Sequence, residues 1–246
     1  MKNKPNTIFN SLFGETKSER NLQIEFDDIL KNVINPFFKE FGFRKNGNAF
    51  NRKLNELIQV VSIQKSKWND PDEVSFTFNI GFFDSEEYLE NSNKEIPKFI
   101  RDYDCQIHFR LGHVVKGNDY WYKLNKKTEK ENLEIEIYNN LHNHLKAILQ
   151  SNTEFNYLKE FILNNTYILI SSIYKIKLFL KVGDFEKAKE LLCKEYFKAL
   201  NPEDYVSKTI YPDGSEFIKT SKSKINTEYI TVLKNIAKHQ NIELEN

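Results

Sequence analysis

The sequence has little of what secreted, membrane-spanning or metal-binding proteins require. Of its 246 residues only two are cysteines, Cys105 and Cys193, and no ligand motif surrounds either of them. We therefore expect both to be reduced thiols in a cytoplasmic protein. No apolar run approaches the ~20 residues needed to cross a bilayer, and residues 1–6 lack the apolar stretch of a secretory signal. The sequence thus predicts no association with a membrane.

Known catalytic and cofactor motifs are missing as well. There is no glycine-rich phosphate loop, no dinucleotide fingerprint, no Gly-x-Ser-x-Gly elbow and no His-Glu-x-x-His. His142 and His144 lie two residues apart on a predicted helix, where they diverge and do not share a metal. His108 and His113 lie five apart on a predicted strand, on opposite faces. We therefore expect no cofactor, no metal and no catalytic residue. An enzyme whose site assembles from distant residues stays as a third interpretation of the function.

A strong charge of one sign is also lacking. The net formal charge is +1, so no global field attracts nucleic acid or anionic lipid. Basic residues do gather between positions 44 and 67, where the one acid is Glu56; they are Arg44, Lys45, Arg52, Lys53, Lys65 and Lys67. They either keep exposed strands from pairing edge to edge or face phosphates, with Trp68 stacking on a base. The chain has five arginines, which favours the first interpretation because arginine is the better phosphate reader.

What the sequence does contain is aromatic residues, 14% of the total, and clear strand patterns. Residues 57–66 are apolar and β-branched, residues 74–82 alternate almost without error, and the polar residues 67–72 between them predict a turn. Side chains alternate faces along a strand, so one face of the second strand holds Val74, Phe76, Phe78, Ile80 and Phe82. The opposite face holds Ser75, Thr77, Asn79 and Gly81, and this polar face is where we expect a function to lie.

Helices and two further strands complete the domain around this hairpin. Apolar residues recur at helical spacing after residue 19 and again after residue 129, and Pro36 interrupts the first of these helices. Residues 43–53 and 105–114 predict the first and the fourth strand. Asp84, followed by a serine and two glutamates, is expected to cap a short helix rather than to bind a metal.

These patterns predict the domain organisation. Residues 1–18 form an N-terminal extension, and residues 19–150 form an α+β domain with a four-stranded antiparallel sheet flanked by helices. Residues 151–246 are expected to be an all-helical C-terminal region, in which Gly183 ends one helix and Asp184 caps the next.

The polar face of the predicted sheet is the candidate site. Its side chains come from three strands and comprise Gln64, Ser66, Thr77, Asn79, His108 and Arg110. An arginine in the middle of a strand needs either solvent or hydrogen-bond acceptors. One interpretation is a solvated sheet face, or a hydrogen-bonded network beneath the C-terminal helices. The other is a site that recognises a carboxylate, a phosphate or a peptide backbone, with Arg110 as its anchor.

Several short motifs occur in a fixed order along the first part of the chain. They are Phe38-x-x-Phe41-Gly42-Phe43-Arg44-Lys45, Gln64-Lys65-Ser66-Lys67-Trp68, Phe76-Thr77-Phe78-Asn79-Ile80-Gly81, Arg110-Leu111-Gly112 and Trp121. Together they resemble the bacterial family called domain of unknown function 4304, over about residues 22 to 150. The resemblance implies no activity, because none is known for the family. Its motif residues map onto Gln64, Ser66, Asn79, Arg110, Gly112 and Trp121.

Two classes of function are compatible with these observations. The first is a non-catalytic binding module, such as an immunity-type or phage-defence-associated protein that holds an unknown protein partner. Its binding residues would be Gln64, Ser66, Asn79, His108, Arg110 and Trp121, with Trp68, Tyr120 and Tyr122 as further aromatic candidates. The second is a nucleic-acid-associated protein that uses the basic residues between Arg44 and Lys67 together with Trp68.

Overall fold

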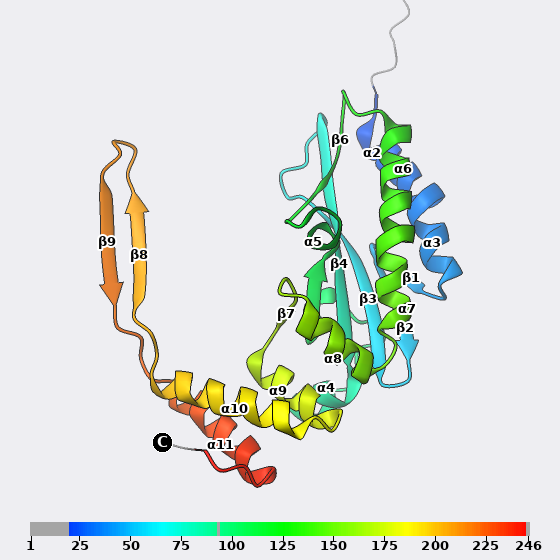
Figure 1. Cartoon of the computed structure of the whole chain (residues 1–246). Coiled ribbons are helices and arrows are strands. Elements are labelled where there is room, and N and C mark those ends of the chain that lie inside the picture. Colours follow the sequence, from blue (N-terminus) through cyan, green and yellow to red (C-terminus); the bar gives the residue numbers. More distant parts are fainter. Residues whose placement is uncertain (1–19, 93, 245–246) are drawn as a thin grey trace, which may run out of the picture. The chain divides into compact units, whose positions relative to one another are not determined.

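The computed structural model describes residues 20–92 and 94–244. The chain divides into two compact units, Met1–Ser151 and Asn152–Asn246 (Figure 1). The N-terminal extension predicted for residues 1–18 lies outside the described residues. That residues 19–150 fold independently of the rest of the chain stays a prediction.

Unit 1 is an α+β structure with an antiparallel sheet, as predicted, but the sheet is larger than the four strands expected. The described part of unit 1 contributes six strands: β1 (Arg44–Asn46), β2 (Ala49–Leu54), β3 (Leu57–Lys65), β4 (Glu73–Asp84), β5 (Ile107–Arg110) and β6 (Tyr122–Asn125). The strands β1 to β4 pair in chain order, and both β5 and β6 pair with the far edge of β4.

Two local features explain the larger number of strands. The predicted strand 43–53 is a hairpin, because Gly47 adopts a φ of 60° and turns the chain between β1 and β2. The predicted strand 105–114 ends at Arg110, where the chain leaves the sheet and forms the helix α5 (Leu111–Lys116). The chain then returns to the sheet as the additional strand β6. Gly112 and His113 are therefore helical residues, so the prediction that Gly112 lies on the polar face of a strand is wrong.

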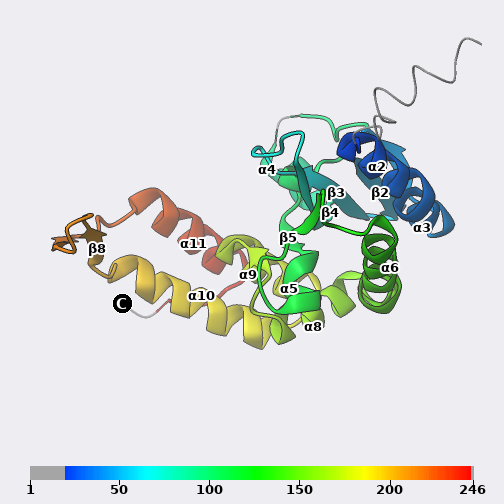
Figure 2. The ribbon, with the colours of Figure 1, turned by 90° about the horizontal axis from the view of Figure 1, so that it is seen from above.

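One face of the sheet is covered by two runs of helix, as Figures 1 and 2 both show. The first run is α2 (Leu22–Ile29), a π-helical turn (Leu30–Ile34) and α3 (Asn35–Glu40); the second is α6 (Lys130–Asn140), a π-helical turn (Leu141–Leu145) and α7 (Lys146–Ser151). Aromatic rings fill the space between the helices and β4: Phe26 meets Phe76 edge to face, with centroids 4.9 Å apart, and Tyr122 stacks on Phe76 at 5.4 Å. This is the apolar face that the alternation in β4 predicted.

The opposite face of the sheet is mostly buried as well. Ser75 and Thr77 are buried, and Ile58, Phe83 and Cys105 are members of a second apolar cluster on this face. The segment that leads to β5 contains α4 (Ser85–Asn91) and a 3₁₀ turn (Asp102–Asp104). The side chain of Asp84 caps α4, which confirms the capping interpretation of that acidic stretch. The polar face is therefore open over only part of the sheet.

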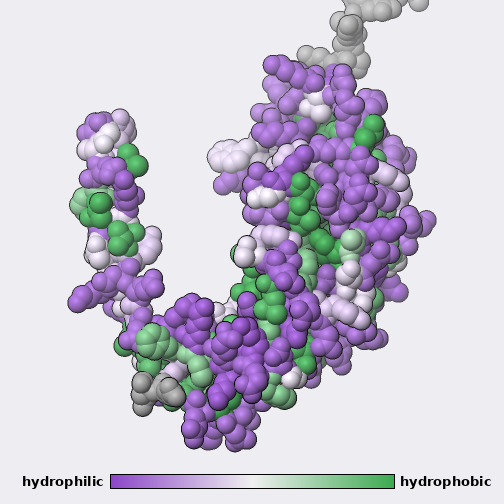
Figure 3. All heavy atoms as spheres, in the orientation of Figure 1, coloured by the Kyte–Doolittle hydropathy of each residue, from purple (hydrophilic) through white to green (hydrophobic). Residues whose placement is uncertain are grey.

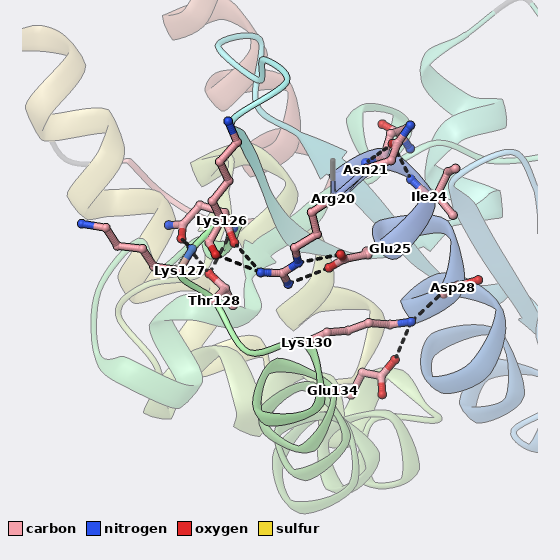
Figure 4. Close-up of polar contacts among 12 residues, drawn as sticks. Arg20, Asn21, Ile24, Glu25, Asp28, Lys126, Lys127, Thr128, Lys130 and Glu134 are labelled. Atoms are coloured by element: carbon pink, nitrogen blue, oxygen red, sulfur yellow. Dashed lines mark hydrogen bonds and ion pairs between the residues drawn. The ribbon is translucent and has the colours of Figure 1, made fainter. Parts of the chain in front are cut away.

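Polar contacts hold the start of α2 against the turn between β6 and α6 (Figure 4). The guanidinium of Arg20 donates two hydrogen bonds to Glu25, at 2.6 and 2.7 Å, and reaches the backbone carbonyl of Lys126 at 3.1 Å. Lys130 lies 2.9 Å from the carboxylate of Asp28, and it also lies 3.8 Å from Glu134 on its own helix. These contacts hold the C-terminal end of β6, which follows the candidate site along the chain.

Unit 2 contains the predicted helices. They are α8 (Phe155–Asn164), α9 (Ser172–Lys181), α10 (Phe185–Leu200) and α11 (Thr227–His239), with a two-residue strand β7 (Leu169–Ile170) between the first two. Buried residues of α9, α10 and α11, among them Ile176, Leu192 and Leu233, form one apolar cluster. Among the described residues of the whole chain, no helix has the length and apolar character that spanning a bilayer requires.

A hairpin interrupts the region that was predicted to be all-helical. Its strands are β8 (Tyr205–Ile210) and β9 (Glu216–Ser221), which pair antiparallel. Apolar side chains on both of its faces are exposed, including Val206 at 59% and Ile218 at 60% on one face and Phe217 at 52% on the other (Figure 3). The all-helical prediction is therefore wrong for residues 205–221 and for the two residues of β7, although α8, α9, α10 and α11 are helices as predicted.

Candidate functional site

The candidate site lies where the edge strand next to β4 is interrupted. Arg110, the last residue of β5, pairs with Asn79, and Tyr122, the first residue of β6, pairs with Phe76. The helix α5 and the loop of residues 117–121 are inserted between these two strands. Because both strands pair with neighbouring parts of β4, the insertion starts and ends at almost the same place. Arg110 and Trp121 therefore come together, with the guanidinium carbon 5.2 Å from the indole centroid.

The guanidinium of Arg110 is held by three side-chain acceptors. Its Nε donates to Oδ1 of Asn79 at 3.3 Å, and one terminal nitrogen donates to Oε1 of Gln64 at 3.3 Å. The other terminal nitrogen donates to Oδ2 of Asp119 at 2.5 Å. Together with the ring of Trp121, these contacts use the edges and one face of the guanidinium. We call these five residues, Gln64, Asn79, Arg110, Asp119 and Trp121, the Arg110 cluster.

Asn79 links the Arg110 cluster to the segment that precedes β5. Its amide nitrogen donates to Oε1 of Gln64 at 3.0 Å and to Oδ2 of Asp102 at 2.8 Å, while its oxygen accepts from Arg110. Every polar atom of the Asn79 side chain is thus used within the protein. This arrangement fixes the orientation of the amide and, through it, one side of the guanidinium.

Asp119 is the charged partner of Arg110. Burial raises the pKa of Asp119, but hydrogen bonds from Arg110 and Trp121 and the charge of Arg110 outweigh it, so the pKa lies below its ordinary value. The side chains of Arg110 and Asp119 remain 33% and 46% exposed. The pair is thus a partly hydrated ion pair at the surface and not a buried one.

The loop that carries Asp119 and Trp121 is fixed by its backbone. A Cβ at Gly112 would lie 2.4 Å from the nitrogen of Tyr120 and 2.8 Å from its oxygen, so only glycine lets the loop lie this close to α5. The hydroxyl of Thr77, on β4, donates to the carbonyl of Tyr120 at 3.1 Å. Both contacts involve main-chain atoms, and they position the loop whatever side chains it carries.

A cavity of about 740 Å³ adjoins the Arg110 cluster, within the size range of ligand sites. We call it the tryptophan cavity, because it is lined by both tryptophans of the chain. Its lining residues come from the β3–β4 turn and the start of β4, from the 118–121 loop, from β6, from the β6–α6 turn and from α6, and they are Ser66, Trp68, Glu73, Ser75, Asn118, Asp119, Tyr120, Trp121, Lys123, Thr128, Glu129, Asn132, Leu133 and Glu136. Trp68 is 80% exposed and stands at the rim.

Two of the predicted binding residues do not join the Arg110 cluster. Ser66 accepts a hydrogen bond from the backbone of Trp68 at 3.1 Å and so shapes the β3–β4 turn, although it also lines the cavity. His108 pairs with Gly81, and its Nδ1 is buried with no hydrogen-bond partner in the described structure. The pKa of Cys105 lies well above its ordinary value, mainly because the thiol is buried and also because the carboxylates of the 3₁₀ turn lie nearby. Cys105 is therefore no thiolate partner for this histidine.

The basic residues between Arg44 and Lys67 do not form one surface. Neighbouring residues of a strand face opposite sides, so Arg44 and Lys45 diverge, as do Arg52 and Lys53. Lys65 contacts Gln23 on α2 at 2.9 Å, and Lys67 lies over the ring of Trp68 at 5.0 Å. These orientations and contacts do not favour a continuous phosphate-facing strip, and binding of nucleic acid by these residues stays a prediction.

Arg52 has a structural role in this region. One of its nitrogens donates to Oε1 of buried Gln59 at 2.6 Å and to the carbonyl of Leu149 at 2.7 Å, and another reaches the carbonyl of Phe41 at 3.3 Å. Burial lowers the pKa of its guanidinium below the ordinary value. Arg52 therefore ties β2 and β3 to the ends of α3 and α7, where free helix carbonyls attract a cation.

Sequence reasoning found the strand residues of the site and, through the family resemblance, Trp121, but it missed the acidic residues. Asp102, Asp119 and Glu136 were not singled out, although the first two are acceptors in or beside the Arg110 cluster and the third lines the tryptophan cavity. The sequence did contain one indication of these acidic residues: an arginine on a half-buried strand requires hydrogen-bond acceptors. The turn residues Gly117 and Asn118, directly before Asp119, also indicated that the chain folds back at this point.

Comparisons with known proteins agree with the resemblance read from the sequence motifs. Residues 34–151 match the model of the family described as Domain of unknown function (DUF4304). The match lies within unit 1 and includes the Arg110 cluster and the whole tryptophan cavity. No curated protein and no solved structure was found to match the chain.

Proposed function

We propose that this chain is a non-catalytic binding module that holds a protein partner through the Arg110 cluster and the tryptophan cavity. The observation that supports this proposal most is the preorganisation of the surface. Arg110, Asp119 and Trp121 are connected by hydrogen bonds and by ring stacking before any partner binds. A rigid surface loses little conformational entropy on association, so more of the contact energy appears as affinity.

The contacts of Arg110 support a positioning role for it within this proposal. Its guanidinium is engaged by three internal acceptors and one ring, so it positions Asp119 and Trp121 rather than binding a ligand on its own. The anchors for a partner are then the two tryptophans, because partly exposed aromatic side chains dominate protein interfaces. A protein that acts by holding its partner, as immunity-type or defence-associated proteins do, needs a surface of this kind and no catalytic group.

Copurification from the native host tests this proposal. Tagged wild-type protein is expected to retain one protein in stoichiometric amount, measured by mass spectrometry of the washed complex. Trp121→Ala and Trp68→Ala should each weaken the affinity for that protein by roughly 30-fold or more, the effect of removing an aromatic hot spot of at least 2 kcal/mol, and so reduce the retained amount. Tyr103→Ala is the matched control, since Tyr103 is as exposed as Trp68, at 80%, but does not line the cavity. Equal retention by all variants, or no retained protein, would contradict the proposal.

A further inference from the structure

The charges that line the tryptophan cavity are mostly negative. Four carboxylates, of Glu73, Asp119, Glu129 and Glu136, face one ammonium group, that of Lys123. The lining therefore carries a formal charge of −3. Arg110 and Lys116, which do not line the cavity, each contact one of these carboxylates, and Lys123 lies 3.8 Å from Glu73, so part of the negative charge is offset within the protein.

The aromatic rings around the cavity already bind cations in this structure. The guanidinium of Arg110 lies 5.2 Å from the centroid of Trp121, and the ammonium of Lys116 lies 5.2 Å from that of Tyr120. Lys67 lies 5.0 Å from the ring of Trp68 in the same way. None of these cations is among the residues that line the cavity. The carboxylates of the cavity favour a further cation beside these rings.

Glu136 is fixed at the wall that α6 contributes. Its carboxylate accepts a hydrogen bond from the hydroxyl of Tyr120 at 3.0 Å. Burial, and then the hydrogen bond to Glu136, raise the pKa of Tyr120 to about 12. The phenol therefore keeps its proton at neutral pH and goes on donating, which holds the carboxylate in one orientation while leaving lone pairs to accept from a ligand.

From these observations we infer that the tryptophan cavity receives a lysine or arginine side chain of the protein partner. The inference rests on the proposed binding function and names the chemistry that the partner presents. Arginine fits best, because its planar guanidinium both stacks on an indole and donates two parallel hydrogen bonds to a carboxylate. A cavity of about 740 Å³ holds such a side chain together with its neighbouring backbone.

Short peptides test this inference without knowledge of the partner. The probes are acetyl-Gly-Arg-Gly-amide, the same peptide with norleucine as an uncharged control of similar length, and the same peptide with glutamate as an anionic control. The readout is the pair of indole N–H signals in ¹H–¹⁵N spectra, because the two tryptophans of the chain both line the cavity. Trp68→Phe assigns the signals. The arginine peptide is expected to shift the Trp121 signal saturably, and added salt should weaken that binding.

Two variants on the same helix separate the cavity charge from a general charge effect. Glu136→Gln keeps an oxygen that accepts from Tyr120 but removes the charge, and it should weaken binding of the arginine peptide about two- to fivefold, as expected for one partly exposed ion pair. Glu131→Gln makes the same change at an exposed position of α6 that does not line the cavity. It should leave the affinity unchanged.

The outcomes distinguish this inference from the proposed function. Equal binding of the norleucine peptide, stronger binding of the glutamate peptide, no saturable shift with the arginine peptide, or equal affinity in Glu136→Gln would each overturn the cation site. A partner captured through the tryptophans in any of those cases would leave the proposed function standing. Binding of the arginine peptide without any captured protein would overturn the proposed function and remove a protein as the source of the cation.

Discussion

Arg110 lies over the indole of Trp121, although the whole of α5 and residues 117–120 separate them along the chain. The relationship arises because β5 and β6 pair with neighbouring parts of one strand, β4. A stretch of chain that could have continued as one edge strand instead leaves the sheet and returns to it. The site is built at this interruption, and its geometry depends on how firmly the two ends of the insertion are joined.

Removing Arg110 should therefore cost a measurable but moderate amount of stability. Arg110→Ala deletes three hydrogen bonds and a ring contact, but Asp119 is 46% exposed and can be hydrated instead. We expect a loss of about 1 kcal/mol in the free energy of unfolding, measured with urea. Arg44→Ala, on an exposed strand, should change it by less than about 0.5 kcal/mol. A loss of several kcal/mol would make the cluster part of the core and end its interpretation as a binding surface.

Adding one methyl group at Gly112 should displace the loop of the site. A Cβ there would lie 2.4 Å from a backbone nitrogen of Tyr120, and a backbone cannot give way as a flexible side chain can. We expect Gly112→Ala to cost about 1–3 kcal/mol, as overpacking does. In a Trp68→Phe background, the fluorescence of Trp121 should also change, because the loop carries it.

The matched control for this prediction is Gly47→Ala. Gly47 has a φ of 60°, so alanine there is strained, but no atom lies within 4 Å of the added Cβ. It should cost about 1 kcal/mol without any change in the emission of Trp121. If both variants changed that emission equally, the displacement of the loop would not be the cause.

Much of the fold could be predicted because strand periodicity is a local property. The alternation of β4 correctly predicted its buried aromatic face, and the same alternation placed Gln64, Asn79 and Arg110 on one side of the sheet, where they meet. Residues 111–114 read as a continuation of β5, since valine and leucine suit a strand. They form a helix instead, because β6 pairs with β4 and the chain has to leave the sheet before it returns there. This pairing is a tertiary contact, which a local pattern does not reveal.

The parts that sequence reasoning missed depend on the path of loops. Asp102 and Asp119 meet the cluster from a 3₁₀ turn and from a loop, and no periodicity places such residues. The hairpin of β8 and β9 was missed for another reason. Its turn and its β-branched residues were visible in the sequence, but each face mixes apolar with polar residues, so no single face indicated a strand.

The stability of unit 1 should depend on pH through Asp119. Its pKa is lowered in the folded state, so its contribution is present above the unfolded pKa of about 3.9 and is lost as the pH falls through the lower folded value. Arg110 stays charged throughout this range. The difference in urea midpoint between wild type and Asp119→Asn should therefore be largest at neutral pH and shrink below about pH 4. A difference that stays constant from pH 7 to pH 3 would show that the charge of Asp119 contributes nothing.

Arg52→Ala should lower stability and Lys53→Ala should not, whereas a nucleic-acid-binding strip would need both side chains at the surface. Arg52→Ala leaves the carbonyl of Leu149 with one hydrogen bond fewer at a buried position, and we expect a loss of about 2–3 kcal/mol in the free energy of unfolding. Lys53→Ala, at an exposed position, should change stability by less than about 0.5 kcal/mol.

Heparin chromatography of Lys53→Ala and wild type gives the second readout. Strong retention of the wild type that Lys53→Ala and salt both weaken would instead support binding of nucleic acid.

The hairpin of β8 and β9 should be dispensable for the stability of unit 2. Its apolar residues are exposed on both faces, and a lone two-stranded hairpin is at best marginally stable in water. Replacing residues 204–222 by a short Gly/Ser linker should change the free energy of unfolding of unit 2 by less than about 0.5 kcal/mol. Leu192→Ala, at a fully buried position of α10, should cost about 2–5 kcal/mol and calibrates the measurement. If removal of the hairpin lowered stability as much as Leu192→Ala does, its exposed faces would be covered in solution, and a concentration dependence of the midpoint would show whether a second copy covers them.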